Sequence, residues 1–342
     1  MKNLESLSLK LTDGQLFILD QQMLPDQENW VSVENPDHMI QIIKDLKVRG
    51  APLIGIAAAL SLGLWSQNKP NLNEFLECSQ SLRESRPTAV NLMNALDRMN
   101  QVAESTDVNS EAIMNKAIEL YDEDVELCLK MAKAGAELIN DGDNILTHCN
   151  TGGLATVGVG TALGVITQAH ALGKKIHVYV DETRPLLQGG RLTTWELQKA
   201  GVPYTLICDN MSGSLMAQSK VQKVFLGADR IAMNGDFANK IGTYNLAVLC
   251  DYHNVPFYTV APKTTIDFDC ESGEKIPVEL RKDSEVKGVF GTFGEIRWAP
   301  KQAETYNPAF DVTPVELLTG MVVDNQVVLR DQIKAGHLQQ FN

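Results

Sequence analysis

The sequence predicts an α/β protein with an N-terminal, mainly helical domain that has a small β portion, followed by a Rossmann-like parallel sheet domain. The chain has 342 residues, which is long for a single domain and favours two. Helical spacing of apolar residues dominates up to about residue 125, and short β-rich runs alternate with helical runs after about residue 143. That alternation is typical of βαβ units in a parallel sheet. We therefore expect domains at residues 1–125 and 126–342.

The first domain is expected to contain a short strand and several helices. Leu16–Leu19 is a short apolar run before a polar loop, which favours a strand. Residues 52–65 are apolar and rich in Ala and Gly, which predicts a buried helix that packs closely against its neighbours. Further helices are expected at residues 37–48, 71–84, 89–103 and 109–140.

The second domain is expected to place polar residues along one edge of its sheet. Strands are expected at residues 145–149, 176–180, 204–208, 223–226 and 257–261, and helices at 154–172, 191–200, 212–219 and 238–253. Nearly every expected strand runs into a polar or glycine-rich cluster. Because ligands bind beyond the carboxyl ends of parallel strands, we expect one rim to carry Cys149, Asp181, Arg184 and Asp229.

Charge and composition restrict the function classes. The net charge is −13, from 30 Lys and Arg against 43 Asp and Glu, so neither nucleic acid nor membrane is an expected partner. The N-terminus lacks the pattern of a signal peptide, and the longest apolar run, at residues 53–65, is too short to span a bilayer. Six cysteines without a CxxC pair predict free thiols. We therefore expect a cytoplasmic protein.

Two residues are candidates for acid–base chemistry. Cys149 ends an expected strand and precedes Asn-Thr-Gly-Gly at an expected helix start, whose partial positive charge would favour a thiolate. The alternative is a buried, inert thiol, which is the commoner state of a free cysteine. Asp229 could serve as a general acid if burial raises its pKa. It could instead cap a helix or pair with Arg230, and the local sequence alone favours these structural roles.

Three short motifs could bind an anion. In Arg49-Gly-Ala-Pro52 and Ser85-Arg-Pro-Thr88, an arginine stands at the mouth of an expected helix, which suits a phosphate group. An exposed arginine in a turn is the structural alternative for each. Asn239-Lys240 is expected at a helix start, where the lysine could also be merely solvated. His148 adjoins Cys149, but neighbouring residues of a strand point to opposite faces, so no Cys–His dyad is expected.

The sequence does not indicate a cofactor or a metal. Gly158, Gly160 and Gly164 have the wrong spacing for a dinucleotide-binding loop and fall inside an expected helix, where close helix–sheet packing explains Gly158 and Gly160 better. His, Cys and Asp residues do not occur with metal-ligand spacing. An NAD-dependent dehydrogenase is therefore disfavoured, and we expect no cofactor and no metal.

Six ordered motifs resemble the 5-methylthioribose-1-phosphate isomerase family, and together they cover most of the chain. They are RGAPLIGIAAAL from Arg49, SRPTAVNLMNALDRM from Ser85, ILTHCNTGGLATVGVGTALGVI from Ile145, DETRPLLQGGRLTTWEL from Asp181, GADRIAMNGDFANKIGTYNLAVL from Gly227 and NPAFDVTP from Asn307. The wider superfamily includes non-catalytic regulatory subunits of a translation-initiation guanine-nucleotide exchange factor.

The resemblance implies an activity, a site and an oligomeric state. It implies conversion of 5-methylthioribose 1-phosphate to 5-methylthioribulose 1-phosphate in methionine salvage, by acid-assisted ring opening and C2-to-C1 hydrogen transfer, in a homodimer without a cofactor. Cys149 stands at the family's catalytic cysteine and Asp229 at its proton donor. The implied substrate-binding residues are Arg49, Gly50, Ala51, Arg86, Gln188, Asn239 and Lys240. A 5-deoxyribose-1-phosphate isomerase and a non-catalytic regulatory protein of the superfamily remain alternatives.

Overall fold

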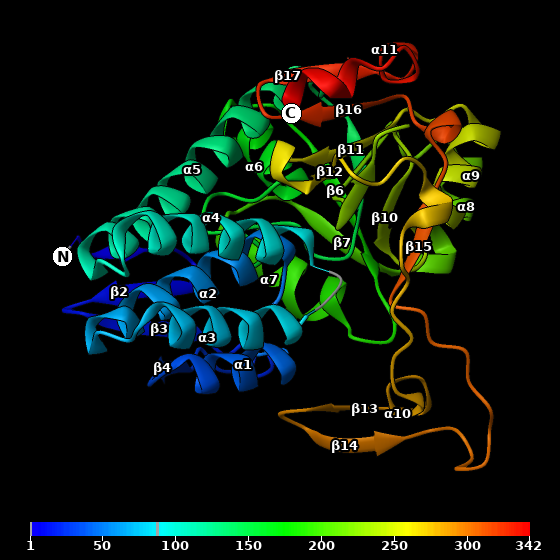
Figure 1. The fold of residues 1–342 in the computed structure, drawn as a ribbon. Coiled ribbons are helices and arrows are strands. Elements are labelled where there is room, and N and C mark those ends of the chain that lie inside the picture. Colours follow the sequence, from blue (N-terminus) through cyan, green and yellow to red (C-terminus); the bar gives the residue numbers. More distant parts are fainter. Residues whose placement is uncertain (1, 87–88) are drawn as a thin grey trace. The chain divides into compact units, whose positions relative to one another are not determined.

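The chain forms two compact units, each of which is visible in the computed structural model of residues 2–86 and 89–342 (Figure 1). One unit comprises Met1–Leu127 and Gly153–Val159, and the other comprises Cys128–Gly152 and Gly160–Asn342. Helices dominate the first unit, and a mostly parallel sheet forms the second, so the predicted fold class is confirmed. Within the described residues, no helix combines the length and the apolar character needed to cross a membrane.

The first unit contains a four-stranded antiparallel sheet, which is a larger β portion than the single strand predicted. Its strands, in the order β1-β2-β3-β4, are β1 (Leu4–Glu5), β2 (Leu9–Thr12), β3 (Gln15–Leu19) and β4 (Trp30–Val33). Its helices are α1 (Pro36–Lys44), α2 (Ala51–Trp65), α3 (Leu72–Glu84), α4 (Val90–Thr106) and the start of α5 (Ser110–Ala136). The four predicted helices outside α2 therefore form, with ends shifted by a few residues.

Helix α2 is the centre of the first unit's core. It is buried on nearly all sides because it is apolar around its whole circumference, as the sequence predicted. The residue before it, Gly50, has a φ of 91° and lies against the segment 153–159. A Cβ atom at Gly50 would lie 2.4 Å from the Cα atom of Ala155, so the close approach of the two segments requires glycine.

The segment 153–159 is not helical, and the prediction of a helix over residues 154–172 was wrong in its first half. Helix α6 (Ala162–Ala171) begins only after this segment. The carbonyl groups of the segment accept hydrogen bonds from Ser8 Oγ to Gly153 (3.1 Å) and from Gln21 Nε2 to Leu154 (2.7 Å), among others. These partners, from loop residues of the first unit, replace the bonds that a helix would have made.

The second unit contains a seven-stranded sheet in the order β17-β16-β11-β8-β5-β6-β7, parallel except for the edge strand β17. Its strands are β5 (Asn144–His148), β6 (His177–Glu182), β7 (Tyr204–Cys208), β8 (Lys223–Leu226), β11 (Phe257–Ala261), β16 (Gly320–Val323) and β17 (Gln326–Leu329). The five predicted strands are all present and parallel. The C-terminal segment returns to supply β16 and β17, and it continues with α11 (Arg330–Lys334) and a 3-10 helix η7 (His337–Phe341).

A second, smaller sheet in the order β12-β9-β10-β15 stands beside the carboxyl end of β8. Its strands are β9 (Arg230–Ala232), β10 (Phe237–Lys240), β12 (Ile266–Asp267) and β15 (Phe310–Thr313). Residues 238–240 were expected to begin a helix over residues 238–253, and this was wrong for these three residues. They are a strand because β9 and β15 hydrogen bond to both of its sides, and helix α9 (Thr243–His253) begins after a turn at Gly242.

Short helices and one projecting hairpin complete the second unit. The helices between strands are a π-helical turn η2 (Gly189–Thr193), α7 (Thr194–Lys199), a 3-10 turn η3 (Asp209–Met211) and α8 (Ser212–Ala217). Helix α10 (Asp283–Lys287) leads into the hairpin β13 (Gly288–Gly291) and β14 (Gly294–Arg297), which extends away from the two sheets of this unit (Figure 1). The other connections cover the faces of the main sheet, as right-handed crossovers require.

Asp124 fixes the segment 153–159 to helix α5 and should make the stability of the first unit depend on pH. Its carboxylate accepts the Val157 amide at 2.8 Å. Burial raises the pKa of Asp124 to about 6, although hydrogen bonds from the Val157 and Gly158 amides act to lower it. In an unfolded chain the pKa is about 3.9, so the folded chain holds a proton that the unfolded chain has lost between these values. Asp124 therefore stabilises the fold less as the pH rises through this range.

We expect Asp124→Asn, which keeps an acceptor but cannot titrate, to gain stability relative to wild type between pH 4 and pH 7. The gain is up to about 3 kcal/mol, from a pKa difference of about two units. Urea unfolding at several pH values measures it. Asp122→Asn, at an exposed position of the same helix, should show no such trend. A pH-independent difference between Asp124→Asn and wild type would contradict this assignment.

Candidate active site

Five of the predicted site residues lie in the second unit, at one edge of its main sheet. Strands β8, β5 and β6 are adjacent and parallel, so their carboxyl ends meet at one edge. Cys149 follows β5, Asp229 follows β8, and Gln188 follows β6. Strand β10 brings Asn239 and Lys240 to the same edge, because its hairpin with β9 begins directly after Asp229.

Cys149 sits at a sharp turn of the main chain. Its φ of 63° is left-handed, a conformation that costs a non-glycine residue about 1–3 kcal/mol unless neighbouring groups enforce it. Thr193, at the end of η2, supplies that support, since its hydroxyl donates a hydrogen bond of 2.5 Å to the Cys149 carbonyl oxygen. The Cys149 side chain is buried, with 9% of the residue exposed. The turn therefore holds the thiol in a protected place at the edge of the sheet.

The residues after Cys149 reinforce this turn. Asn150 Nδ2 donates to Glu196 Oε1 at 2.7 Å and to the Thr193 hydroxyl at 3.3 Å. The chain then returns to the start of α6, where the Thr151 carbonyl oxygen accepts the Thr161 amide at 2.8 Å. Gly160 permits this return, because a Cβ atom there would lie 2.4 Å from the Gly152 Cα atom. Gly160 thus serves a turn, and the expectation that it packs a helix on the sheet was wrong.

Helix α6 does not begin at residue 154, soon after Cys149, contrary to the sequence-based expectation. Its first residue is Ala162, yet the Leu163 amide hydrogen bonds to the Thr151 hydroxyl at 3.3 Å. The loop that starts at Cys149 therefore contacts the N-terminus of α6 through the Thr151 hydroxyl, although about ten residues separate the two in the chain.

Asp229 lies where β9 and β10 begin to separate. Its amide donates to the Ala238 carbonyl oxygen at 2.9 Å, one residue beyond the Arg230–Ala238 pair of the ladder. That register sets Asp229 opposite Asn239. The cap role that the local sequence favoured is wrong, because a strand rather than a helix follows Asp229. Arg230 forms an ion pair of 2.7 Å with Asp267.

Asn239 and Lys240 are buried residues of β10, so the alternative of a solvated lysine is wrong. They are 4% and 6% exposed. Lys240 Nζ donates to the Ala309 carbonyl oxygen at 3.1 Å and lies 5.2 Å from the centre of the Phe310 ring. Asn239 Nδ2 donates to the Thr243 hydroxyl at 2.9 Å at the start of α9. The side chains are thus held in fixed orientations by β15 and α9.

Gln188 and Arg184 follow β6 and have different surroundings. Gln188 immediately precedes η2, and its Oε1 accepts a hydrogen bond of 2.8 Å from the Thr183 hydroxyl. Arg184 donates to the Glu285 carbonyl oxygen at 2.6 Å and stacks on the Trp298 ring at 4.6 Å. Arg184 therefore ties the hairpin β13–β14 and α10 to the loop after β6, and it has a structural use in this unit.

Asp181 belongs to strand β6 itself and not to the loop beyond it, which corrects its expected place on the rim. Its carboxylate is fully buried and lies 3.1 Å from Nδ1 of His148. His148 faces Asp181 and, on its other side, the Ile241 carbonyl oxygen at 3.0 Å. The expectation that His148 forms no dyad with Cys149 agrees with these contacts.

The remaining predicted residues lie in the first unit. Gly50 and Ala51 form the N-terminus of α2, and Arg49 precedes them. Arg86 lies between α3 and α4, and its amide donates to the Arg83 carbonyl oxygen at 3.4 Å. Pro87 and Thr88, the last two residues of the predicted Ser85–Thr88 motif, lie outside the described residues.

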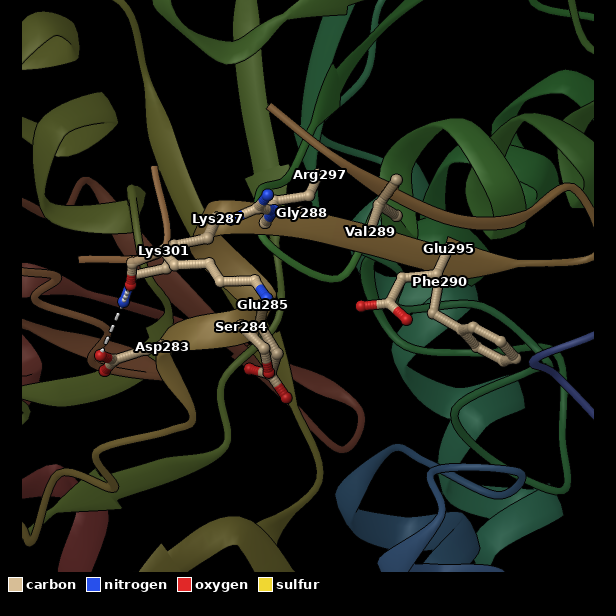
Figure 2. Close-up of a pocket in the computed structure, with 10 residues that line it drawn as sticks. All are labelled: Asp283, Ser284, Glu285, Lys287, Gly288, Val289, Phe290, Glu295, Arg297 and Lys301. Carbon is tan, nitrogen blue, oxygen red and sulfur yellow. Dashed lines mark hydrogen bonds and ion pairs between the residues drawn. The ribbon is translucent and has the colours of Figure 1, made fainter. Parts of the chain in front are cut away.

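One pocket of the second unit involves none of the predicted site residues (Figure 2). It has a volume of about 400 Å³ and lies between α10 and the hairpin β13–β14. Its lining combines Glu285, Lys287 and Arg297 with the exposed ring of Phe290. Acidic and basic side chains both line the pocket, but they do not point to one common position, so the geometry of the pocket does not indicate a reaction.

Residue types alone did not reveal the groups that support the site. Thr193, Glu196 and the Ile241 carbonyl act through hydrogen bonds to residues far away in the chain. A threonine hydroxyl or a main-chain carbonyl has no distinctive pattern. The buried Glu196, two residues beyond a pair of threonines, was the one unusual feature that could have drawn attention to this support.

Comparisons with known proteins agree with this architecture. The model of the "Initiation factor 2 subunit family" matches residues 47–327. The chain is 54% identical over 336 residues to a methylthioribose-1-phosphate isomerase of Cronobacter sakazakii, covering 98% of this chain and 99% of the relative. A crystal structure of 5-methylthioribose 1-phosphate isomerase from Pyrococcus horikoshii matches with a TM-score of 0.87 and 39% identity, over 98% of this chain and 96% of that one.

A structure of translation initiation factor eIF-2B, subunit delta, from A. fulgidus is also similar, with a TM-score of 0.84 and 38% identity over 98% of this chain and 99% of that one. Fold and family model together define a member of the initiation factor 2 subunit family. Within it, the full-length similarity at 54% identity decides between enzymes and initiation factors. The chain belongs to the methylthioribose-1-phosphate isomerase family and is an isomerase, which confirms the resemblance found in the sequence.

The Thr193 hydroxyl should contribute measurably to stability. Thr193→Val keeps the side-chain volume but leaves the buried Cys149 carbonyl oxygen without this donor, and we expect a loss of about 1–3 kcal/mol. Urea unfolding of the full chain measures it. Thr205→Val changes an exposed hydroxyl of β7 and should shift stability by less than about 0.5 kcal/mol. Equal losses of stability in the two variants would show that the hydrogen bond to the Cys149 carbonyl oxygen does not stabilise the fold.

Proposed function

We propose that this protein converts 5-methylthioribose 1-phosphate to 5-methylthioribulose 1-phosphate, a step of methionine salvage, in the cytoplasm. The observation that carries the proposal is the buried, left-handed Cys149 at a sheet edge that also holds Asp229, Asn239 and Lys240. The relatives that are 54% identical bear the name of this activity. The geometry and the resemblance point to the same residues, because the family motifs contain the side chains found at this edge of the sheet.

The chemistry requires an acid and a base of different character. A sugar 1-phosphate is a locked cyclic acetal, so its ring oxygen must be protonated before the bond from that oxygen to C1 breaks. Asp229 supplies this proton. Cys149 then takes the C2 proton, and the electrons of the C2–H bond form a C1=C2 double bond in a cis-enediol that keeps the phosphate on C1. Protonation of C1 and loss of the O2 proton give the C2 ketone.

A hydride shift is the alternative route for the same pair. In it, the C2 hydrogen moves to C1 with its electron pair, and Asp229 and Cys149 handle only the oxygen-bound protons. A substrate deuterated at C2 distinguishes the routes, because the enediol route exchanges the label with water and the hydride shift retains it in the product.

The substrate phosphate is assigned to cationic and main-chain groups of the family motifs. Arg49, Arg86 and Lys240 are the proposed cations. The amides at Gly50 and Ala51 stand at the start of α2, where a helix has no partners of its own for its first amides and the helix dipole favours an anion. Arginine can bind a phosphate through two parallel hydrogen bonds, which makes Arg→Lys a costly change at such a site.

A 5-deoxyribose-1-phosphate isomerase is the nearest alternative, and a non-catalytic regulatory protein is the more distant one. Retention of both Cys149 and Asp229 in their motifs favours an enzyme over a regulatory subunit. The test is an assay with both sugar 1-phosphates, without added cofactor, that measures ketose formation. We expect the methylthio substrate to have the higher kcat/KM. A higher kcat/KM for the deoxy substrate would favour the first alternative, and the absence of turnover with both would favour the second.

Substitution of the reacting pair should abolish turnover without preventing binding. Cys149→Ser replaces the thiol by a much weaker acid, and Asp229→Asn removes the proton donor, so each should lower kcat by roughly 10²–10⁴-fold while substrate still binds. Cys208→Ser and Asp269→Asn, at exposed positions, are the matched controls and should retain wild-type kcat. A Cys149→Ser or Asp229→Asn enzyme with near-normal kcat would show that the chemistry belongs to another residue.

The proposal includes a homodimer formed through the second unit. Helix α9 exposes three large side chains spaced four residues apart: Tyr244 at 46%, Val248 at 41% and Tyr252 at 80%. Such a stripe lies on one face of a helix and suits a helix of a second copy. Another face of α9, with Leu246, Ala247 and Cys250, is buried in the core of the unit.

We expect sedimentation at micromolar concentration to give twice the chain mass of 37.6 kDa for wild type. Val248→Asp places a charge in the stripe and should shift the protein to the monomer, because an unpaired charge is costly in an apolar interface. Leu172→Asp, at a position 58% exposed after α6, should leave the dimer intact. A monomeric wild type, or a Val248→Asp variant that remains a dimer, would contradict this interface.

A further inference from the structure

His148 lies between two acceptors inside the second unit. It is the last residue of β5 and is fully buried. Its Nδ1 lies 3.1 Å from Oδ2 of Asp181 on β6, and its Nε2 lies 3.0 Å from the carbonyl oxygen of Ile241, directly after β10. A carbonyl oxygen can only accept a hydrogen bond, so Nε2 must carry a hydrogen.

The contact with Asp181 then requires a second proton. With the hydrogen on Nε2, a neutral imidazole would direct the Nδ1 lone pair at a carboxylate oxygen. Moving the hydrogen to Nδ1 instead would direct the Nε2 lone pair at the Ile241 carbonyl oxygen. Both arrangements are repulsive in a buried place. The pair of His148 and Asp181 therefore holds one additional proton between Nδ1 and the carboxylate.

The surroundings of His148 favour the charged ring. Three carboxylates from three elements act on it or lie near it: Asp181 on β6, Asp209 in η3 and Asp311 on β15. Burial opposes a charged ring, but the hydrogen bond and charge of Asp181 outweigh it, and the pKa of His148 is raised. Burial also raises the pKa of Asp181 to about 6, while the hydrogen bond and the charge of His148 act against this rise. The thiol of Cys250 on α9 also faces Asp181, and its own pKa is raised by burial, which leaves it uncharged.

We infer that His148 is a positioning residue: as an imidazolium it holds the Ile241 carbonyl, and with it the turn after Lys240, against the end of β5 from which Cys149 follows. The role of this positioning in turnover rests on the proposed function, since it assumes that Lys240 binds the substrate phosphate. The charge state of His148 does not depend on that function. The two parts can therefore be tested separately.

The charge state is tested by NMR of the full-length protein labelled with ¹⁵N-histidine, between pH 6 and pH 9. We expect both ring nitrogens of His148 to be protonated over the range from pH 6 to pH 8. Asp181→Asn is the matched variant, because its amide can donate to Nδ1 and leave a neutral ring that still donates from Nε2. In that variant Nδ1 should be unprotonated. An unprotonated Nδ1 in the wild type at pH 7 would overturn the inference.

The positioning role is tested by separating KM from kcat. His148→Phe removes both hydrogen bonds, and we expect KM to rise about tenfold or more with a smaller change in kcat, as loss of a charge-assisted contact to the phosphate would give. Asp181→Asn keeps the bond to Ile241 and should raise KM less. His177→Phe, at the opposite end of β6, should leave both constants unchanged.

Two outcomes would contradict the positioning role. One is an unchanged KM in His148→Phe, and the other is an equal rise of KM in His148→Phe and Asp181→Asn. If His148→Phe does not fold, Asp181→Asn and the NMR signals decide, because a KM of Asp181→Asn more than tenfold above wild type would show that the bond to Ile241 is not sufficient. Failure of every variant and of wild type to turn over substrate would overturn the proposed function, whereas the NMR result would still decide the charge of His148.

Discussion

The hydrogen bond from the Thr193 hydroxyl to the Cys149 carbonyl oxygen is the interaction on which the candidate site depends. It connects the turn after β5 to the end of η2 and supports a left-handed residue that would otherwise be strained. Because η2 begins directly after Gln188, the same bond fixes the distance between the segment of the thiol and the segment of Gln188. A loop held by solvent-exposed bonds would not keep a reacting group in a constant orientation.

The order of the parallel strands does the rest of the positioning. Strands β8, β5 and β6 are neighbours, so residues that are about forty positions apart in the chain, such as Cys149, Gln188 and Asp229, leave the sheet at one edge. Two further bonds attach the smaller sheet to this edge, from His148 to Ile241 and from Asp229 to Ala238. The proposed acid, base and phosphate ligand of the second unit are therefore held by rigid strands and their first turns.

The sequence predicted most of this fold because apolar strands and amphipathic helices have local patterns. It failed where the conformation depends on distant partners. Residues 154–159 look helical, but the carbonyl oxygens of Thr156 and Leu154 accept hydrogen bonds from Ser8 and Gln21, well over a hundred positions away. Residues 237–240 form a strand because β15 pairs with them, and β15 lies some seventy positions later. Local patterns hold no information about such partners.

The candidate site shows the same division. The residue types of Cys149, Asp229 and the substrate-binding positions were identified from motifs, and their chemical roles remain predictions. The supporting groups, Thr193 above all, were not identified, because a buried hydroxyl that donates to one carbonyl leaves no pattern in the sequence. What the structure adds is therefore the orientation of the predicted residues and the reason why each keeps it.

A crystal structure with 5-methylthioribulose 1-phosphate bound would test the central claim most directly. The account predicts that the Cys149 thiol lies in contact with C1 and C2 and that the Asp229 carboxylate lies within hydrogen-bond distance of the former ring oxygen. It also predicts that Cys149 keeps its left-handed φ and that its carbonyl oxygen still accepts the hydrogen bond from Thr193. Sugar phosphate bound elsewhere, for instance in the pocket between α10 and the hairpin β13–β14, with the edge of the main sheet empty, would contradict it.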